Sequence, residues 1–218
     1  MKKIGVLLSG CGHLDGSEIR EAVLTLLALD QYGAEALIMA PNIDQHHVVN
    51  HLTGEESNET RNVLVEASRI ARGKIKALSE VKSSEIDALM IPGGFGAAKN
   101  LSNLAFEGAK GKLNQEVEEF LLAVHNEKKP IGAICIAPAV ISLLFGRMGA
   151  EVTIGNDQGT ADTIRSIGGK HSDCSASEVC VDSKLKIVST PAYMYDDASL
   201  FKISQGINQC VKQVIDWL

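Results

Sequence analysis

The sequence predicts a doubly wound α/β domain, in which a mostly parallel sheet carries helices on both faces. Short aliphatic runs, typical of strands buried on both sides, alternate with segments whose apolar residues recur at helical spacing. The 218 residues are 45% hydrophobic but only 4% aromatic, and no linker, repeat or low-complexity segment divides them. We therefore expect a single domain over residues 1–218.

The expected elements follow this alternation. Aliphatic runs predict strands at 2–10, 34–40, 86–91 and 131–136, with a final strand pair at 178–182 and 185–191. Helices are expected after the first strand, at 60–73, 114–129 and 137–146, near 160–169, and from about 196 onward. In the first helix, Ile19, Val23, Leu26 and Leu27 recur at helical spacing, and we expect this face to be buried.

Charge and hydropathy exclude several classes of partner. Acidic residues outnumber basic ones by 27 to 21, and the net charge of -6 is not offset by any block of Lys or Arg. The chain therefore offers no electrostatic surface for nucleic acid or for an anionic membrane. The apolar run near residue 6 is too short to span a bilayer and lacks a cleavage site, so we expect a cytosolic protein.

The cysteine pattern predicts reduced thiols and no metal. Five cysteines, an odd number without C-x-x-C spacing, occupy Cys11, Cys135, Cys174, Cys180 and Cys210. Neither a disulfide framework nor a zinc site is indicated, and we expect no metal and no cofactor. The polar, histidine-bearing insert at 42–62 completes no metal-ligand spacing either. It is expected to shape a crevice rim or an oligomer contact, or to be a solvated loop.

The ligand site of a doubly wound sheet lies beyond the carboxyl ends of its strands, where the N-termini of the helices also point. That rule selects the loops at 9–18, 92–100, 135–138 and 189–194. We expect these loops to converge on one crevice.

Cys135 is the strongest candidate for chemistry. It ends a strand and is followed three residues later by Pro138, which suits a first helical turn because it needs no N–H partner. A thiol at such a turn faces helix amides that stabilise the thiolate, as in a nucleophile elbow. The alternative is a buried cysteine that only packs.

Glu18 and Gly94 can serve such a thiol. Glu18 lies at the carboxyl edge of the first strand and can act as a proton shuttle, or it can close a capping box with Asp15 as the N-cap. The amide of Gly94 can approach a developing oxyanion without obstruction by a side chain.

Three further residues lie at the expected edge of the site. His13 is the only histidine in a loop at this edge, and a solvated side chain is the alternative. Cys11 shares that loop, as a small buried residue or as a redox partner of Cys135. Tyr193 can orient a ligand or pack against the last helix.

Several segments together resemble one known family. The segments "GCGHLDGSEIREAVLTLLAL", "IPGGFGAAKNLSN", "CIAPA" and "TPAYM" are similar to the DJ-1/PfpI superfamily, within it to the branch of the ES1 and enhancing-lycopene-biosynthesis proteins. The resemblance spans essentially the whole chain. It implies a flavodoxin-like sandwich, similar to class I glutamine amidotransferases and usually dimeric. It also implies a nucleophile at Cys135, a glutamate at Glu18, and an anion-binding or substrate-binding element formed by Gly93, Gly94 and Ile136.

The same resemblance implies a function. It points to a glyoxalase III-type lyase that converts small dicarbonyls, preferably glyoxal, to a 2-hydroxy acid without glutathione or metal. Two alternatives stay open: a redox-sensing or regulatory protein linked to isoprenoid biosynthesis, and an amidotransferase-like subunit that acts with a partner. The chain departs from the DJ-1 branch at Gly155 and Asn156, where that branch carries a histidine. It also departs from the glutamine amidotransferases, in which a His and a Glu follow the last strand, because "STPAYM" supplies neither, and this weighs against a Cys-His-Glu glutaminase.

Overall fold

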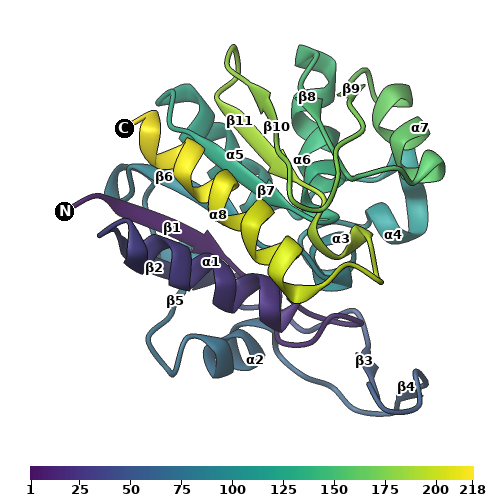
Figure 1. The fold of residues 1–218 in the computed structure, drawn as a ribbon. Coiled ribbons are helices and arrows are strands. Elements are labelled where there is room, and N and C mark those ends of the chain that lie inside the picture. Colours follow the sequence, from purple (N-terminus) through teal and green to yellow (C-terminus); the bar gives the residue numbers. More distant parts are fainter.

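The computed structural model describes all residues from Met1 to Leu218 and has the predicted α/β architecture (Figure 1). A 7-stranded sheet in the order β10-β11-β7-β6-β1-β2-β5 forms its centre. Every neighbouring pair in it is parallel except β10 with β11. The strands of this sheet are β1 (Lys3–Leu7), β2 (Glu35–Ala40), β5 (Lys76–Ala77), β6 (Ala88–Ile91), β7 (Ile131–Ile134), β10 (Cys180–Asp182) and β11 (Ile187–Thr190).

Helices cover both faces of the sheet, so the doubly wound prediction is confirmed (Figure 1). The helices are α1 (Ile19–Gln31), α2 (Val63–Ile70), α3 (Phe95–Lys99), α4 (Leu104–Glu107), α5 (Gln115–Asn126), α6 (Ala137–Phe145), α7 (Gln158–Ser166) and α8 (Leu200–Asp216). On one face α1 and α8 pack against each other, with α2 nearby. The helices α5 and α6 pack on the other face. None of them has the length and apolar character needed to cross a membrane.

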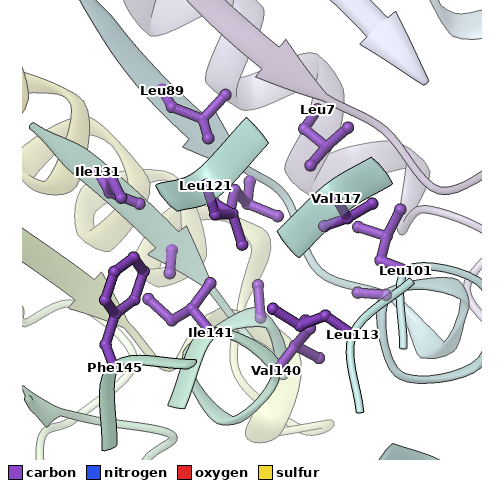
Figure 2. Close-up of a cluster of buried hydrophobic side chains, with 14 of the residues drawn as sticks. Leu7, Leu89, Leu101, Leu113, Val117, Leu121, Ile131, Val140, Ile141 and Phe145 are labelled. Carbon is purple, nitrogen blue, oxygen red and sulfur yellow. The ribbon is translucent and has the colours of Figure 1, made fainter. Parts of the chain in front are cut away.

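The hydrophobic core lies in two layers because successive strand residues point to opposite faces. In β1, Val6 belongs to the layer beneath α1 and α8, whereas Leu7 belongs to the layer beneath α5 and α6. Figure 2 shows part of the second layer, where Leu121 of α5 and Ile141 of α6 approach Ile131 of β7. These two layers fix the sheet and therefore the loops that follow its strands.

Two small sheets lie outside the main one. In the 42–62 insert, β3 (Val48–Val49) pairs antiparallel with β4 (Glu56–Ser57). The apolar stretch at 150–155 contributes only β8 (Glu151–Val152), which pairs parallel with β9 (Lys170–His171). The sequence did not predict these short pairs, because two residues are too few to produce a periodic signal.

Of the four residues on the predicted buried face of the first helix, only Leu26 packs against the core, where it is partly buried. Ile19, Val23 and Leu27 are about half exposed, at 46%, 49% and 50%. The buried residues of α1 are Glu21, Ala22, Thr25, Ala28 and Leu29. The prediction was wrong because α1 packs closely against α8, and small side chains suit such a close helix contact better than large aliphatic ones.

Candidate active site

Cys135 lies at a tight turn between β7 and α6. Its φ of +62° is unusual for a residue other than glycine, and its amide is fixed by donation to the carbonyl oxygen of Thr190 at 2.9 Å. Pro138 lies in the first turn of α6, as the sequence predicted. The side chain of Cys135 is 7% exposed. Strand, strained turn and helix together have the geometry of a nucleophile elbow.

The polar contacts of the Cys135 thiol come from two other loops as well as its own. The Glu21 carboxyl group and the backbone N–H groups of Gly94 and Ile136 lie close enough to the thiol to act on its pKa. Burial, and after it the Glu21 carboxylate, raise the pKa of the thiol well above its usual range, while the two amides act in the opposite direction. The sulfur therefore lies where amides can stabilise a negative charge once the Glu21 carboxyl carries the proton.

Glu21 is the functional residue that sequence reasoning missed. It is fully buried in the first turn of α1, and both of its oxygens accept backbone hydrogen bonds. Oε2 accepts from Gly93 at 2.9 Å and Oε1 from Tyr193 at 3.1 Å. Burial, followed by the neighbouring Glu18 carboxylate, raises the pKa of Glu21 to about 8. A carboxyl group with such a pKa can both hold and release a proton near neutral pH.

Glu18 does not occupy the position beside the Cys135 thiol that was expected for it. It is the N-cap of α1, and its Oε2 accepts a hydrogen bond from the Glu21 amide at 2.6 Å. The predicted capping box with Asp15 as N-cap is wrong, because Asp15 is buried and its Oδ2 accepts from the amide of Val49 at 2.8 Å. Glu18 still lines the cavity that contains Cys135.

Gly93 and Gly94 allow the loop after β6 to lie against the Cys135 turn and the start of α1. A Cβ on Gly93 would collide with the Cβ of Cys135 and would lie 2.7 Å from Glu21 Oε2. Gly94 has a φ of +97°, and a Cβ there would collide with the backbone at Gly16 and Glu18. Glycine at both positions is therefore what lets the thiol, the carboxyl group and the α1 N-terminus meet.

The four predicted loops converge on one cavity of about 710 Å³. Each contributes to its lining: His13 and Glu18 from the first loop, Gly94 and Phe95 from the second, Cys135 and Ile136 from the third, and Tyr193 and Met194 from the fourth. The start of α7 adds Asp157 and Thr160, close to the segment where the sequence lacks the histidine of the DJ-1 branch. The expected crevice therefore exists at the carboxyl edge of the sheet.

The three residues expected at the site edge separate into two groups. His13 and Tyr193 line the cavity, and the Tyr193 hydroxyl accepts a hydrogen bond from Arg20 Nη1 at 3.0 Å. Cys11 does not line it. Charges on Glu66 and Arg69 of α2 act on its thiol, whose pKa is raised chiefly by burial. The structure thus separates Cys11 from Cys135, because the first loop turns back on itself through a hydrogen bond from the amide of Gly16 to the carbonyl of Gly12.

The 42–62 insert braces the first loop. The His51 ring packs edge-on against His13 with centroids 5.1 Å apart, and its Nε2 accepts from the Leu14 amide at 3.2 Å. The insert therefore supports the rim of the cavity, which is one of the roles expected for it. All five cysteines are free, and no cluster of side chains has the composition of a metal site.

The sequence that builds this site matches a known family model. The model of the DJ-1/PfpI family covers residues 14–196. The chain belongs to the DJ-1/PfpI family. This match contains all the residues that line the cavity except His13, and it confirms the family predicted from the sequence.

Similar proteins define the branch within the family. The mitochondrial ES1 protein homolog of Rattus norvegicus is 45% identical over 98% of this chain and 83% of its own length. The crystal structure of an isoprenoid biosynthesis protein with an amidotransferase-like domain from Ehrlichia chaffeensis is 41% identical, covers 100% of this chain and 99% of that chain, and superposes with a TM-score of 0.93. The amidotransferase-like sandwich is therefore confirmed.

A more distant structure shows the same fold. Glyoxalase III from Candida albicans has a TM-score of 0.60 with 14% identity and covers 99% of this chain and 96% of that chain. At this identity the likeness concerns the fold alone. The rat relative is named as mitochondrial, so the cytosolic location expected for this chain stays a prediction.

Proposed function

We propose that this protein is a cofactor-independent glyoxalase that converts glyoxal, and other small dicarbonyls, to a 2-hydroxy acid such as glycolate. The observation that carries the proposal is the contact between the Cys135 thiol and the buried Glu21 carboxyl group, with the Gly94 and Ile136 amides on the same sulfur. A nucleophile, a proton carrier and an oxyanion-stabilising pair are the groups that an internal redox isomerisation requires.

The reaction begins at the thiol. In the molecules in which Glu21 is ionised, Cys135 transfers its proton to the Glu21 carboxylate, and the thiolate adds to one aldehyde carbon, forming a carbon–sulfur bond and a hemithioacetal oxyanion. The Gly94 amide, which acts on the charge at the sulfur, stabilises that oxygen. Glu21 then gives the proton that it took from Cys135 to the oxyanion, which completes the hemithioacetal and restores the Glu21 carboxylate.

Proton transfer then oxidises the carbon bonded to sulfur and reduces the neighbouring carbon. The Glu21 carboxylate removes the proton from the hemithioacetal carbon, which gives an enediol, and returns a proton to the neighbouring carbon. The first carbon becomes a thioester and the second a hydroxymethyl group, so no external electron acceptor takes part. Water hydrolyses the thioester, releasing glycolate and restoring the Cys135 thiol.

Glu21 replaces Glu18 as the proton carrier in this mechanism. Glu18 was selected from its position after the first strand, but the carboxyl group that acts on the thiol is that of Glu21. Glu18 positions Glu21, because its carboxylate accepts from the Glu21 amide and its charge raises the pKa of Glu21.

The test is glycolate formation from glyoxal by metal-free protein, with four variants measured beside the wild type. We expect Cys135→Ala to abolish turnover, Glu21→Gln to lower kcat by about 10²-fold or more, and Glu18→Gln to lower it by less. Cys210→Ala, which removes a buried thiol of α8 that does not line the cavity, is the matched control and should retain activity. Equal turnover by wild type and Cys135→Ala would overturn the proposal.

One observation favours a second candidate function, a redox-sensing or regulatory protein. A carboxyl group with a pKa of about 8 keeps a proton beside the sulfur, and that proton would stabilise an oxidised cysteine by hydrogen bonding. The Ehrlichia chaffeensis relative is named as an isoprenoid biosynthesis protein, and this name connects the candidate with isoprenoid biosynthesis. Peroxide treatment followed by intact-mass measurement tests it: reversible oxidation of Cys135 in a protein without glyoxal turnover would place sensing first.

The amidotransferase alternative has less support. A cysteine glutaminase uses a histidine as the base on its thiol. The side chain that acts on the Cys135 thiol is a carboxyl group, and the cavity histidine, His13, is exposed on the first loop. Ammonia release from glutamine in the presence of a partner would be the result that restores this alternative.

A further inference from the structure

The cavity is larger than glyoxal requires. Its volume of about 710 Å³ falls in the range of sites that enclose ligands of roughly drug size, whereas glyoxal has only four heavy atoms. Part of the lining is apolar, from Ile19, Phe95, Ile136 and Met194. The cavity can therefore enclose an apolar body attached to the carbonyl group that reacts with Cys135.

Most of the charged side chains in the lining are acidic. Carboxylates come from three separate places: Glu18 at the N-cap of α1, Asp157 at the N-cap of α7, and Asp196 in the segment before α8. None of the three forms an ion pair. Hydrogen bonds from Thr160 lower the pKa of Asp157, so this carboxyl group is ionised at neutral pH.

A single guanidinium group opposes these carboxylates. Arg20 donates to the Tyr193 hydroxyl at 3.0 Å, and the nearby carboxylate that acts on its charge is Glu18. Since Arg20 lies near Glu18, Asp157 and Asp196 are left as two exposed carboxylates on the rim that have no basic side chain as a partner. A cleft lined by charge of one sign raises the local concentration of ligands of the opposite sign.

We propose that this cavity selects carbonyl compounds that carry an apolar body and a cationic group, such as an amine-bearing aldehyde. The reacting carbonyl rests on the proposed function, but the charge selection does not, because it follows from the rim alone. Asp157 and Asp196 are the specificity-determining residues. They attract the cationic end while the carbonyl group reaches Cys135 at the base of the cavity.

The first experiment measures charge selection without turnover. Methanethiosulfonate reagents that carry an ethyltrimethylammonium, a neutral ethyl or an ethylsulfonate group modify Cys135 by one reaction. The thiolate attacks the sulfenyl sulfur, a disulfide forms, methanesulfinate leaves, and the thiol proton passes to Glu21 or to solvent. Modification of Cys135 is followed by peptide mass, and each rate is divided by that of the same reagent with a small neutral thiol.

We expect the cationic reagent to modify Cys135 about tenfold faster than the anionic one at low salt, with the neutral reagent between them. Added salt should reduce this ratio because the rim is exposed to solvent. The double variant Asp157→Asn, Asp196→Asn should bring the ratio close to one. Asp162→Asn, which removes a carboxylate of α7 that lies outside the cavity lining, should leave the ratio unchanged. His13→Gln tests whether the His13 imidazole, which lines the cavity, contributes to the ratio.

The second experiment measures turnover of three phenylglyoxals of similar size, whose para groups are trimethylammoniomethyl, hydroxymethyl and carboxymethyl. We expect kcat/KM to fall in that order and the double variant to remove the difference. Charge-selective modification without turnover of any dicarbonyl would overturn the proposed function and keep the charge selection. Turnover with no charge preference in either experiment, or a preference for the anionic reagent, would overturn the charge selection alone.

Discussion

The backbone N–H of Gly93 donates a hydrogen bond to Glu21 Oε2 at 2.9 Å, so the loop after β6 holds the carboxyl group that faces the elbow cysteine. The same glycine lies against Cys135, since a Cβ on it would collide with the cysteine Cβ. Gly93 is thus the point at which three loops of the site meet. Because it has no side chain, the Glu21 carboxyl group and the Cys135 thiol can lie close together.

We expect Gly93→Ala to remove activity and to destabilise the fold. The added methyl group has no free space, and overpacking of this kind costs about 1–3 kcal/mol in free energy of unfolding. Denaturant unfolding and glyoxal turnover measure the two effects. The control is Gly159→Ala in α7, where a Cβ meets only Asp157 Oδ1 at 3.7 Å, and a small stabilisation is expected. Full activity of Gly93→Ala would contradict the described contact.

The raised pKa of Glu21 predicts a pH-dependent stability. Folding raises the pKa of this carboxyl group from 4.5 to about 8. Between these values the folded chain holds one proton more than the unfolded chain, so the contribution of Glu21 to stability falls as pH rises. The free energy of unfolding should decrease by about 1.4 kcal/mol per pH unit in this window from Glu21 alone.

Glu21→Gln removes this slope, because an amide does not titrate. The difference in free energy of unfolding between variant and wild type should therefore increase in favour of the variant from pH 5 to pH 8, whatever constant offset the substitution introduces. Urea titrations over that range measure it. Glu107→Gln, which replaces an exposed carboxylate, should leave the difference flat. A flat difference for Glu21→Gln would show that Glu21 is ionised in the folded protein.

The fold could be predicted because its signals are local and strong. Strands such as β6 and β7 are short continuous apolar runs, and glycine or proline follows or interrupts them where the chain turns. The elbow at Cys135 was predictable for the same reason, since strand end and helix start are both visible in the sequence. The rule that ligand sites follow strand ends then brought the four loops together.

The choice between two glutamates could not be made from periodicity. In α1 the large residues Ile19, Val23 and Leu27 form one stripe, while Glu21, Thr25 and Ala28 form another, and both have helical spacing. Which stripe faces the core depends on the close packing of α1 against α8, which are distant in sequence. The small residues that follow Glu21 at i+4 and i+7 were the signal available, because they mark a close helix contact.

Asn100 joins the first loop to the insert and should be a stability determinant. Its Nδ2 donates to the carbonyl oxygens of Ser9 and Asp15, each at 2.9 Å, and its Oδ1 accepts from the His46 amide at 2.9 Å. We expect Asn100→Ala to lower the free energy of unfolding by about 2–4 kcal/mol, because buried backbone groups lose their partners.

Turnover should respond to the same substitution, since the loop held by Asn100 carries His13 and Glu18 into the cavity. Thermal unfolding and glyoxal turnover provide the two readouts. The control is Asn58→Ala in the exposed part of the insert, which should change neither. A stability of Asn100→Ala equal to that of the wild type would mean that solvent replaces these hydrogen bonds.

We expect the exposed apolar stripe of α1 to form the interface of the homodimer. Ile19, Val23 and Leu27 form an apolar row, with exposed Arg20 and Asp30 toward its two ends. When two copies of α1 pair antiparallel about a two-fold axis, the apolar rows meet, and Arg20 of each copy approaches Asp30 of the other. A second copy of the chain therefore matches this face in both hydrophobicity and charge.

Val23→Asp should convert such a dimer to a monomer, because it places a charge at the centre of the apolar row. Sedimentation equilibrium of wild type and variant at several concentrations measures the change. The matched control is Val65→Asp on α2, an equally large substitution at a valine that is 59% exposed, and it should remain dimeric. A wild type that is monomeric at every concentration would refute the homodimer. A Val23→Asp variant that stays dimeric would place the interface on another face. Ile19 and Arg20 line the cavity as well as the α1 face, so in that case the partner subunit would not cover the cavity at these two residues.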